Sequence, residues 1–452
     1  MKPCARPLAW GLVCVALACA HAPSPVVQEA STALPRGVWR SRGYGRLFQV
    51  EATGVTGFHV AGPFCYRDPR PEADPDGWLG GHQRLTDDTL AVSGTPGGTR
   101  YVLERLPALP AACEDRTPWT ADRLAALTAE TFATLYPTSA ARGLDWSARA
   151  ATAARRLDAS SDDAALFEAL SEMLADVDDA HVELHATVGG EPRELTPGEA
   201  PTLRRLARAD MDERTWLRAY KRGILEDILR GTGRQVANHR LFWGRVEDVG
   251  YLNVVTMGAF DADAAPDDTT ALEAALDEAL GAFQGARAVI VDVSNNRGGY
   301  DGVSLRLAGR FASERRLAYT KVGFGARDVA PQAFHVEPSP RVRYEGPVYL
   351  LTSDVTVSAG EVFTLAMRAL PNVRHVGTTT RGALSDQLEK PLPNGWRLAL
   401  AGEVYRDAQG TDFEPRGIPP AMPLEVFPPD APAQGHARAV LRLMTALATA
   451  PR

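Results

Sequence analysis

The sequence predicts an α/β (α+β) protein with a crossover mixed-sheet core, a helical subdomain and a small N-terminal β domain. Three observations predict this class. Strands alternate with helices of ten or more residues from residue 249 onward, which is typical of crossover units in a parallel or mixed sheet. Helical periodicity dominates residues 120–236. Residues 37–112 contain short strand patterns separated by Gly, Pro and Asp breaks.

Length and charge set the first limits on function. A chain of 452 residues is long enough for two or three domains, each with its own core. Its composition, 45% hydrophobic and 23% charged, is that of an ordinary globular protein. The net charge is −7 and no basic block occurs, so we expect no nucleic-acid partner.

The N-terminus has the pattern of an export signal. Lys2 and Arg6 precede an apolar run at residues 8–18, which is too short for a stable membrane span. The run ends in Ala-Leu-Ala-Cys19, which resembles a bacterial lipoprotein cleavage box. We therefore expect residues 1–19 to be a signal peptide, with Cys19 lipidated and residues 20–36 as a linker. Simple secretion, with cleavage near Ala20 or Ala22, is the alternative; either places the protein in the bacterial cell envelope (periplasm) or outside the cell.

Residues 37–115 are expected to form the small β-rich domain. The strand patterns cover residues 37–50, 57–61 and 99–106. The two cysteines of the mature chain, Cys65 and Cys113, lie in this region, and an oxidising compartment favours a disulfide between them over two buried free thiols. No catalytic pattern occurs here, so the region is interpreted as a binding or covering module.

The remaining chain divides into three expected parts. Residues 116–240 form the helical subdomain, with helices predicted at 120–136, 164–175 and 213–229. Residues 241–430 form the α/β core, with strands at 249–257, 288–293, 348–351 and 374–377 and helices at 272–283 and 303–311. Residues 431–452 form a C-terminal helix.

Ser358 is the strongest candidate nucleophile. It follows the strand at 348–351 and opens a helix, where backbone amides and the helix dipole can stabilise negative charge. Acyl-transfer enzymes place a nucleophile beside an oxyanion hole at such a turn. The elbow G-x-S-x-G is half matched, since Gly360 fits but Thr356 does not. Taken alone, Ser358 could equally be a helix N-cap. The Asn-Asn-Arg-Gly-Gly turn at 295–299 also follows a strand, where chemistry collects in such sheets.

A serine nucleophile needs a base, and His181 is the best-placed histidine. It lies where the predicted helix at 164–175 gives way to an alternating strand. The segment His181-Val-Glu-Leu-His185 also invites a metal interpretation, but Glu183 is one place late for the zincin motif. Histidines four apart on a strand lie roughly 13 Å apart at about 3.3 Å per residue. We therefore predict no metal site.

The motifs together resemble the C-terminal-processing (tail-specific) serine peptidases, which include the tricorn core and the retinoid-binding repeats. The resemblance covers residues 120–427. Its five blocks occur in family order: Asp-Ala-His at 179–181, Val-Asp-Val-Ser-Asn-Asn-Arg-Gly-Gly at 291–299, Thr-Val-Ser-Ala-Gly-Glu at 356–361, Gly-Thr-Thr-Thr-Arg-Gly at 377–382 and Glu-Pro-Arg-Gly-Ile-Pro-Pro at 414–420.

Departures from the family pattern select a branch. Ala383 occupies the position of the catalytic lysine in the Ser/Lys branch, and Lys390 is expected to be a surface residue. The helical pattern between residues 185 and 250 leaves no room for that branch's PDZ domain. Both points favour the tricorn-like, retinoid-binding-protein-like branch without a PDZ domain, in which histidine is the base. Ala180 and Ala421 replace residues that can supply a relay hydroxyl and a closing contact.

The resemblance implies roles for individual residues. Ser358 would attack the scissile carbonyl and His181 would act as its base. Glu414 would orient the histidine, with Asp386 as a second candidate and Glu361 as a third that could also brace the loop. The oxyanion hole would use the backbone amides of Gly298 or Gly299 and of Ala359.

The predicted function is therefore an exported serine endopeptidase without metal or organic cofactor, acting on a peptide or protein substrate. Its only expected link to a membrane is the N-terminal lipid anchor, and the sequence does not define an oligomeric state. Two alternatives stay open. The cleft could bind a peptide or hydrophobic ligand without cleaving it. Residues 37–112 could instead be an envelope interaction module for which the core is a scaffold.

Overall fold

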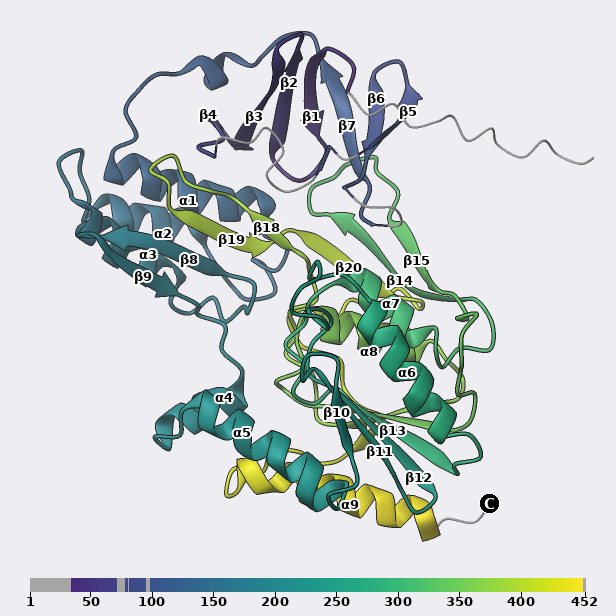
Figure 1. The fold of residues 1–452 in the computed structure, drawn as a ribbon. Helices are drawn as coiled ribbons and strands as arrows, with labels where there is room; N and C mark the ends of the chain where they lie inside the picture. The colour runs from purple at the N-terminus through teal and green to yellow at the C-terminus, as the bar shows by residue number, and fades with distance from the viewer. Residues whose placement is uncertain (1–33, 71–77, 80, 95–97, 450–452) are drawn as a thin grey trace, which may run out of the picture.

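A seven-stranded antiparallel sheet forms the N-terminal part of the computed structural model, which describes residues 34–70, 78–79, 81–94 and 98–449 (Figure 1). The leader, Cys19 and most of the linker lie outside these residues. Spatial order in the sheet is β4-β3-β2-β1-β7-β6-β5. The strands are β1 (Gly37–Ser41), β2 (Arg46–Glu51), β3 (Gly54–Ala61), β4 (Phe64–Arg67), β5 (His82–Thr86), β6 (Thr89–Val92) and β7 (Tyr101–Leu106).

A disulfide joins β4 to the short helix that follows this sheet. Cys65 lies on β4 and Cys113 in the 3-10 helix η1 (Ala111–Glu114), and their Cα atoms are 4.6 Å apart. Both cysteines are buried with Val38, Leu47 and Phe58 in a small apolar cluster on one side of the sheet. The bond therefore ties the chain leaving the β domain to the face of that domain.

Three helices and a hairpin follow. The helices are α1 (Ala121–Leu135), α2 (Trp146–Ala154) and α3 (Asp163–Leu174), and the hairpin is β8 (Glu183–Val188) and β9 (Glu191–Leu195). Helices α2 and α3 start where capping chemistry predicts, because Asp145 and Asp162 accept hydrogen bonds from their first-turn amides, whereas the Thr120 side chain before α1 makes no capping hydrogen bond. Strand β8 also pairs with β19 (Arg397–Ala401), which pairs with β18 (Gln387–Glu389). The helical region is thus joined to the core by a shared four-stranded sheet.

The core is built on a second seven-stranded sheet with spatial order β10-β11-β12-β13-β16-β17-β21. Pairing is parallel from β12 to β21 and antiparallel between β10, β11 and β12. The strands are β10 (Arg234–Val236), β11 (Leu241–Val246), β12 (Val249–Val254), β13 (Ala288–Asp292), β16 (Val348–Thr352), β17 (Val373–Gly377) and β21 (Met422–Pro423). This arrangement confirms the predicted crossover mixed sheet.

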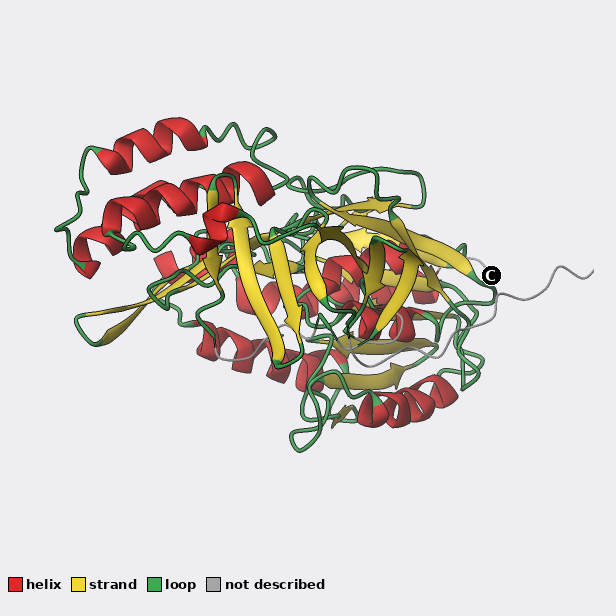
Figure 2. Cartoon of the chain, turned by 90° about the horizontal axis from the view of Figure 1, so that it is seen from above, coloured by secondary structure: helices red, strands yellow, loops and turns green. Residues whose placement is uncertain are grey.

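Helices cover both faces of this sheet. One face packs against α6 (Thr270–Ala282), α7 (Asp301–Ala308) and α8 (Ala359–Arg368), and the other against α4 (Pro201–Arg208), α5 (Glu213–Gly223) with its π-helical extension η2 (Ile224–Ile228), and α9 (Pro432–Thr449) (Figure 1). Strand β13 is continuously apolar because helices cover both of its faces. Val289 and Val291 are buried on the face that packs against α6–α8, and Ile290 on the face that packs against α4, α5 and α9. The view from above shows helices on several sides of the strands (Figure 2).

A three-stranded sheet completes the core, with order β15-β14-β20. Its strands are β14 (Arg316–Gly323), β15 (Gln332–Val336) and β20 (Glu403–Asp407). The helical pattern expected between residues 185 and 250 was only partly right: α4, α5 and η2 lie there, but so do the strands β9, β10 and β11. Among the described helices, none combines the length and apolar character needed to cross a bilayer.

The prediction that Lys390 is a surface residue was wrong. Only 1% of its surface is exposed, and its Nζ donates hydrogen bonds to the backbone oxygens of Tyr44 and Gly45, both at 2.7 Å. Burial lowers the pKa of the Lys390 ammonium well below its usual value. Tyr44 also donates to the Glu403 carboxylate at 2.7 Å. These contacts dock the N-terminal β domain onto the core.

Candidate active site

Ser358 occupies a strained turn directly before α8. Its φ is 58° and its ψ is −129°, a left-handed conformation that non-glycine residues adopt rarely and at a cost of about 1–3 kcal/mol. Although Ser358 is the N-cap residue of α8, its hydroxyl makes no capping hydrogen bond. The helix therefore does not use this side chain as a cap, and the half-buried hydroxyl stands at the positive end of the helix dipole.

Two neighbouring turns hold Ser358 in this conformation. The first follows β13 and the second follows β16, so parallel pairing brings their carboxyl ends together. Thr356 Oγ1 donates to the Val293 oxygen at 2.8 Å, and the Val357 amide donates to the Asn296 oxygen at 3.1 Å. The two turns therefore meet at the carboxyl edge of the parallel strands, as the strand-end rule predicts.

The glycine turn approaches Ser358 closely. A Cβ added to Gly298 would lie 2.6 Å from the Ser358 Cβ, so only glycine fits there. The Gly298 amide already donates to Asn296 Oδ1 at 2.9 Å. Among the described residues, no acceptor is found for the amides of Gly299 and Ala359. These two amides are the ones free to receive a developing oxyanion, because a donor already in use is less available.

A second segment, held by Glu361, reaches Ser358 from the other side. The Ser358 amide donates to the Ala383 oxygen at 2.9 Å. Glu361, one turn into α8, accepts hydrogen bonds from the amides of Gly382 and Ala383, each at 2.8 Å, and from Thr380 Oγ1 at 2.5 Å. Burial raises the pKa of Glu361 to about 7. Glu361 therefore braces the loop, which was one of its two predicted roles.

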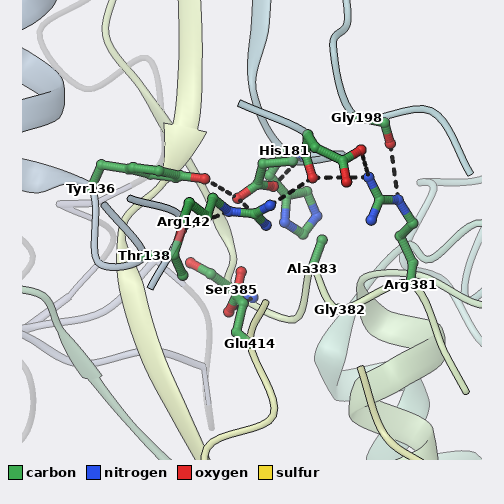
Figure 3. A network of polar contacts seen from close by, with 12 residues as sticks. Tyr136, Thr138, Arg142, His181, Gly198, Arg381, Gly382, Ala383, Ser385 and Glu414 are labelled. Carbon is green, nitrogen blue, oxygen red and sulfur yellow. Dashed lines mark hydrogen bonds and ion pairs between the residues drawn. The ribbon is translucent and has the colours of Figure 1, made fainter. Parts of the chain in front are cut away.

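His181 is buried between the helical region and this loop (Figure 3). Its backbone amide donates to Asp179 Oδ1 at 2.9 Å. The other Asp179 oxygen accepts from the Tyr136 hydroxyl at 2.6 Å and lies 3.5 Å from the Arg142 guanidinium. Burial lowers the pKa of the His181 imidazole, an effect that Asp179 and Glu183 partly oppose. A neutral imidazole is the form that can accept a proton.

Glu414 lies beside His181, as the family resemblance predicted. Ligand-type atoms of Asp179, His181 and Glu414 all lie within 4.8 Å of one another. Glu414 Oε2 accepts from the Ser385 amide at 3.2 Å, whereas Glu414 Oε1 and His181 Nδ1 are buried without a hydrogen-bond partner among the described residues. Burial, followed by the nearby carboxylates of Asp179 and Glu361, raises the pKa of Glu414 well above its usual value.

Among the described residues, Asp179, His181 and Glu414 form the group that most resembles a metal site. Asp179 already receives hydrogen bonds from His181 and Tyr136 and the charge of Arg142. The arrangement therefore suits a proton-transfer site better than a metal site.

Asp386 lies with a different group of charges. Burial of its carboxyl group, then repulsion from Glu403 and Asp301, raises the pKa of Asp386 to about 6, while Lys321 opposes this rise. The Asp386 residue as a whole is exposed to solvent, although protein atoms surround its carboxyl group. Lys321 is buried and lies 3.2 Å from Glu403 and 3.4 Å from Asp301. No hydrogen bond or ion pair joins Asp386 to His181 among the described residues.

Sequence reasoning missed the residues that hold Asp179, the carboxylate that accepts a hydrogen bond from the His181 amide. Tyr136 and Arg142 come from the end of α1 and the turn after it, and no motif marks them. Arg381, inside a recognised block, was also unassigned; it donates to Asp178 Oδ1 at 2.7 Å and to the Gly198 oxygen at 3.1 Å (Figure 3). It ties the Ser358-bracing loop to the segment that carries His181. Among the described residues, no hydrogen bond joins Ser358 Oγ to His181.

Comparisons with known proteins agree with this arrangement. Residues 248–424 match the Peptidase family S41. The carboxy-terminal processing protease CtpA of Bacillus subtilis (strain 168) is 25% identical over 162 residues, which make up 35% of this chain and 33% of that protein. The matched region therefore spans about a third of that relative's length.

Two solved structures share the fold. One, described as a peptidase from Parabacteroides merdae, is 22% identical with a TM-score of 0.59, covering 73% of this chain and 96% of that one. The other, mature CPAF complexed with lactacystin, is 13% identical with a TM-score of 0.54, covering 73% and 98%. At these identities the likeness is one of fold.

The structure places the strained serine turn within a core of mixed α/β architecture. Residues 248–424 carry the family match, and the remaining motifs agree with it in order. Residues 248–424 thus form a region that matches Peptidase family S41, and part of the chain is similar to a carboxy-terminal processing protease.

Proposed function

We propose that this protein is an exported serine endopeptidase that cleaves peptide bonds through a Ser358/His181 acyl-enzyme mechanism. The observation that carries the proposal is the conformation of Ser358, strained at the start of α8 with the Ala359 amide free beside it. Strain of this kind persists where the surrounding structure imposes it, and it is found at functional sites.

In the proposed reaction, Ser358 Oγ attacks the scissile carbonyl carbon while His181 takes the hydroxyl proton. The carbonyl oxygen becomes an oxyanion and accepts from the Ala359 and Gly299 amides, each typically worth roughly 3–4 kcal/mol of barrier. The tetrahedral intermediate then collapses, and the leaving amine takes the proton from His181. Water, deprotonated by His181, hydrolyses the acyl-enzyme. Glu414 orients the imidazole.

The relative positions of Ser358 and His181 are also compatible with a second function. Because no hydrogen bond joins the two side chains among the described residues, the cleft could bind a peptide or hydrophobic ligand without cleaving it. Hydrogen bonds in catalytic sites often tighten only around substrate, so the peptidase remains the first proposal.

A fluorophosphonate serine-hydrolase probe tests the mechanism directly. Wild type should be labelled, and Ser358→Ala and His181→Ala should not. His185→Ala is the matched control, since this partly exposed histidine on β8 pairs with Glu183 at 3.0 Å and should leave labelling unchanged. Labelling that survives His181→Ala would identify a different base. A folded wild type that binds peptides but is never labelled would support the binding function.

Location and domain roles are part of the same proposal. We propose that residues 1–19 direct export, that Cys19 is lipidated in the cell envelope, and that residues 37–115 cover the core. The contacts of Lys390 with Tyr44 and Gly45 support a docked β domain rather than a separate tethered module. Fractionation of cells expressing wild type and Cys19→Ser tests the anchor: the variant should leave the membrane fraction, and retention there would refute lipidation.

A further inference from the structure

A buried polar cluster lies on the face of the core sheet that packs against α5 and α9. It connects the C-terminal helix to the turns that carry Gly299 and Ser358. At its centre is Asp292, the last residue of β13, with no exposed surface. Its Oδ2 accepts from His436 Nε2 at 2.6 Å and from the Tyr251 hydroxyl at 2.5 Å. His436 lies on α9 and is 1% exposed. The mechanism proposed above uses none of these three residues.

The other Asp292 oxygen faces the catalytic turn. Oδ1 accepts from the Ser294 amide at 2.9 Å, which fixes the first bend after β13. The Ser294 oxygen in turn accepts from Ser353 Oγ at 2.5 Å, in the turn that leads to Ser358. Ser353 Oγ also accepts from the Val355 amide at 3.0 Å. Asp292 is therefore linked by hydrogen bonds to the turn after β13 directly, and through Ser294 to the turn that leads to Ser358.

We propose that His436 is a positioning residue, through which docking of the C-terminal helix orders the two turns that carry Gly299 and Ser358. This inference rests on the proposed peptidase function. A buried carboxylate needs its donors, and removing one leaves it free to take another, such as a neighbouring backbone amide. Loss of the His436 donor would let Asp292 rotate and release Ser294.

The surroundings of His436 fix its direction. Its ring lies 4.4 Å from that of Tyr220 on α5 and 5.9 Å from that of Phe427, measured between ring centroids. The Tyr220 hydroxyl accepts from Asn253 Nδ2 at 2.7 Å, and the same Nδ2 donates to the Asp292 oxygen at 3.2 Å. The imidazole thus packs against two aromatic rings with Nε2 directed at the carboxylate.

The test compares His436→Ala with Val440→Ala in the full chain. Val440 lies one turn later on α9, has no exposed surface and packs in the same apolar cluster, but it has no polar link to Asp292. Both changes should lower Tm. Only His436→Ala should lower kcat for peptide cleavage, by about ten- to hundredfold with KM little changed, since a small misplacement of reacting groups has this effect. His436→Gln, which returns a donor at a similar reach, should restore most of kcat.

Hydrogen exchange separates this inference from the proposed function. In a Ser358→Ala background, peptides spanning residues 293–299 should exchange faster when His436→Ala is added and not when Val440→Ala is added. That result would hold even for a protein without peptidase activity. Equal exchange in the two variants, or an equal loss of kcat in both, would reduce His436 to a packing residue and overturn the proposal.

Discussion

Replacing Glu361 by Gln should destabilise the core and disturb the nucleophile together. The carboxylate accepts hydrogen bonds from the amides of Gly382 and Ala383, one on each oxygen. A glutamine has only one acceptor oxygen, so in either orientation one buried amide faces an NH₂ group. An unsatisfied buried donor costs about 1–3 kcal/mol. Because the Ala383 oxygen accepts from the Ser358 amide, the displaced loop would move the nucleophile.

The assay should be made at pH 8, above the pKa of about 7 to which burial raises Glu361, so that the wild-type carboxyl group is ionised. Differential scanning calorimetry should show Tm lowered by a few degrees, since about 1 kcal/mol corresponds to roughly 2–4 °C in a domain of this size. Fluorophosphonate labelling should slow about tenfold. The exposed Glu278→Gln on α6 is the control. Unchanged Tm and labelling rate in Glu361→Gln would refute the bracing role.

Three further predictions concern the same molecule. Glu414→Gln keeps the shape but removes the carboxyl group that can share a proton with His181, so kcat should fall at least tenfold in a peptide-cleavage assay; an unchanged kcat would shift the orienting role to Asp179. Burial lowers the pKa of His181, so the acidic limb of kcat/KM should have its midpoint below pH 6.5, and a midpoint above it would contradict the neutral buried base. Replacing Cys65 and Cys113 by Ser opens a loop with a sequence separation of 48 residues and should lower the free energy of unfolding by roughly 3–4 kcal/mol, measured by chemical denaturation; identical curves for the double variant and wild type would contradict it.

The fold was largely predictable because its signals are local. Apolar runs such as the one at β13, capping residues such as Asp162 and glycine turns such as that at Gly298 each specify a short segment. Strand ends also predicted that the turns after β13 and β16 meet at one edge of the sheet. Pairings between distant segments were not readable. The link from β8 to β19, across more than two hundred residues, follows from tertiary packing alone.

Buried charge was the hardest feature to predict. Lys390 reads as a surface residue because a sequence shows a charge but not the carbonyl groups that replace its water. The same limit applied to the carboxylate beside His181, for which Glu414 and Asp386 were both candidates. Both residues lie in the predicted α/β core at residues 241–430, and no spacing rule shows which of them lies beside His181.

The structure separates the two carboxylates by their partners. Glu414 lies with Asp179 and His181, and its free Oε1 and the free His181 Nδ1 are the groups that a proton or a bridging donor would join. Asp386 instead lies near Lys321, which is already paired with Glu403 and Asp301. Among the described residues no hydrogen bond or ion pair joins Asp386 to His181, so Asp386 has no direct contact through which to orient the imidazole. Asp386→Asn should therefore leave fluorophosphonate labelling within about twofold of wild type, and a loss as large as that of Glu414→Gln would reverse this assignment.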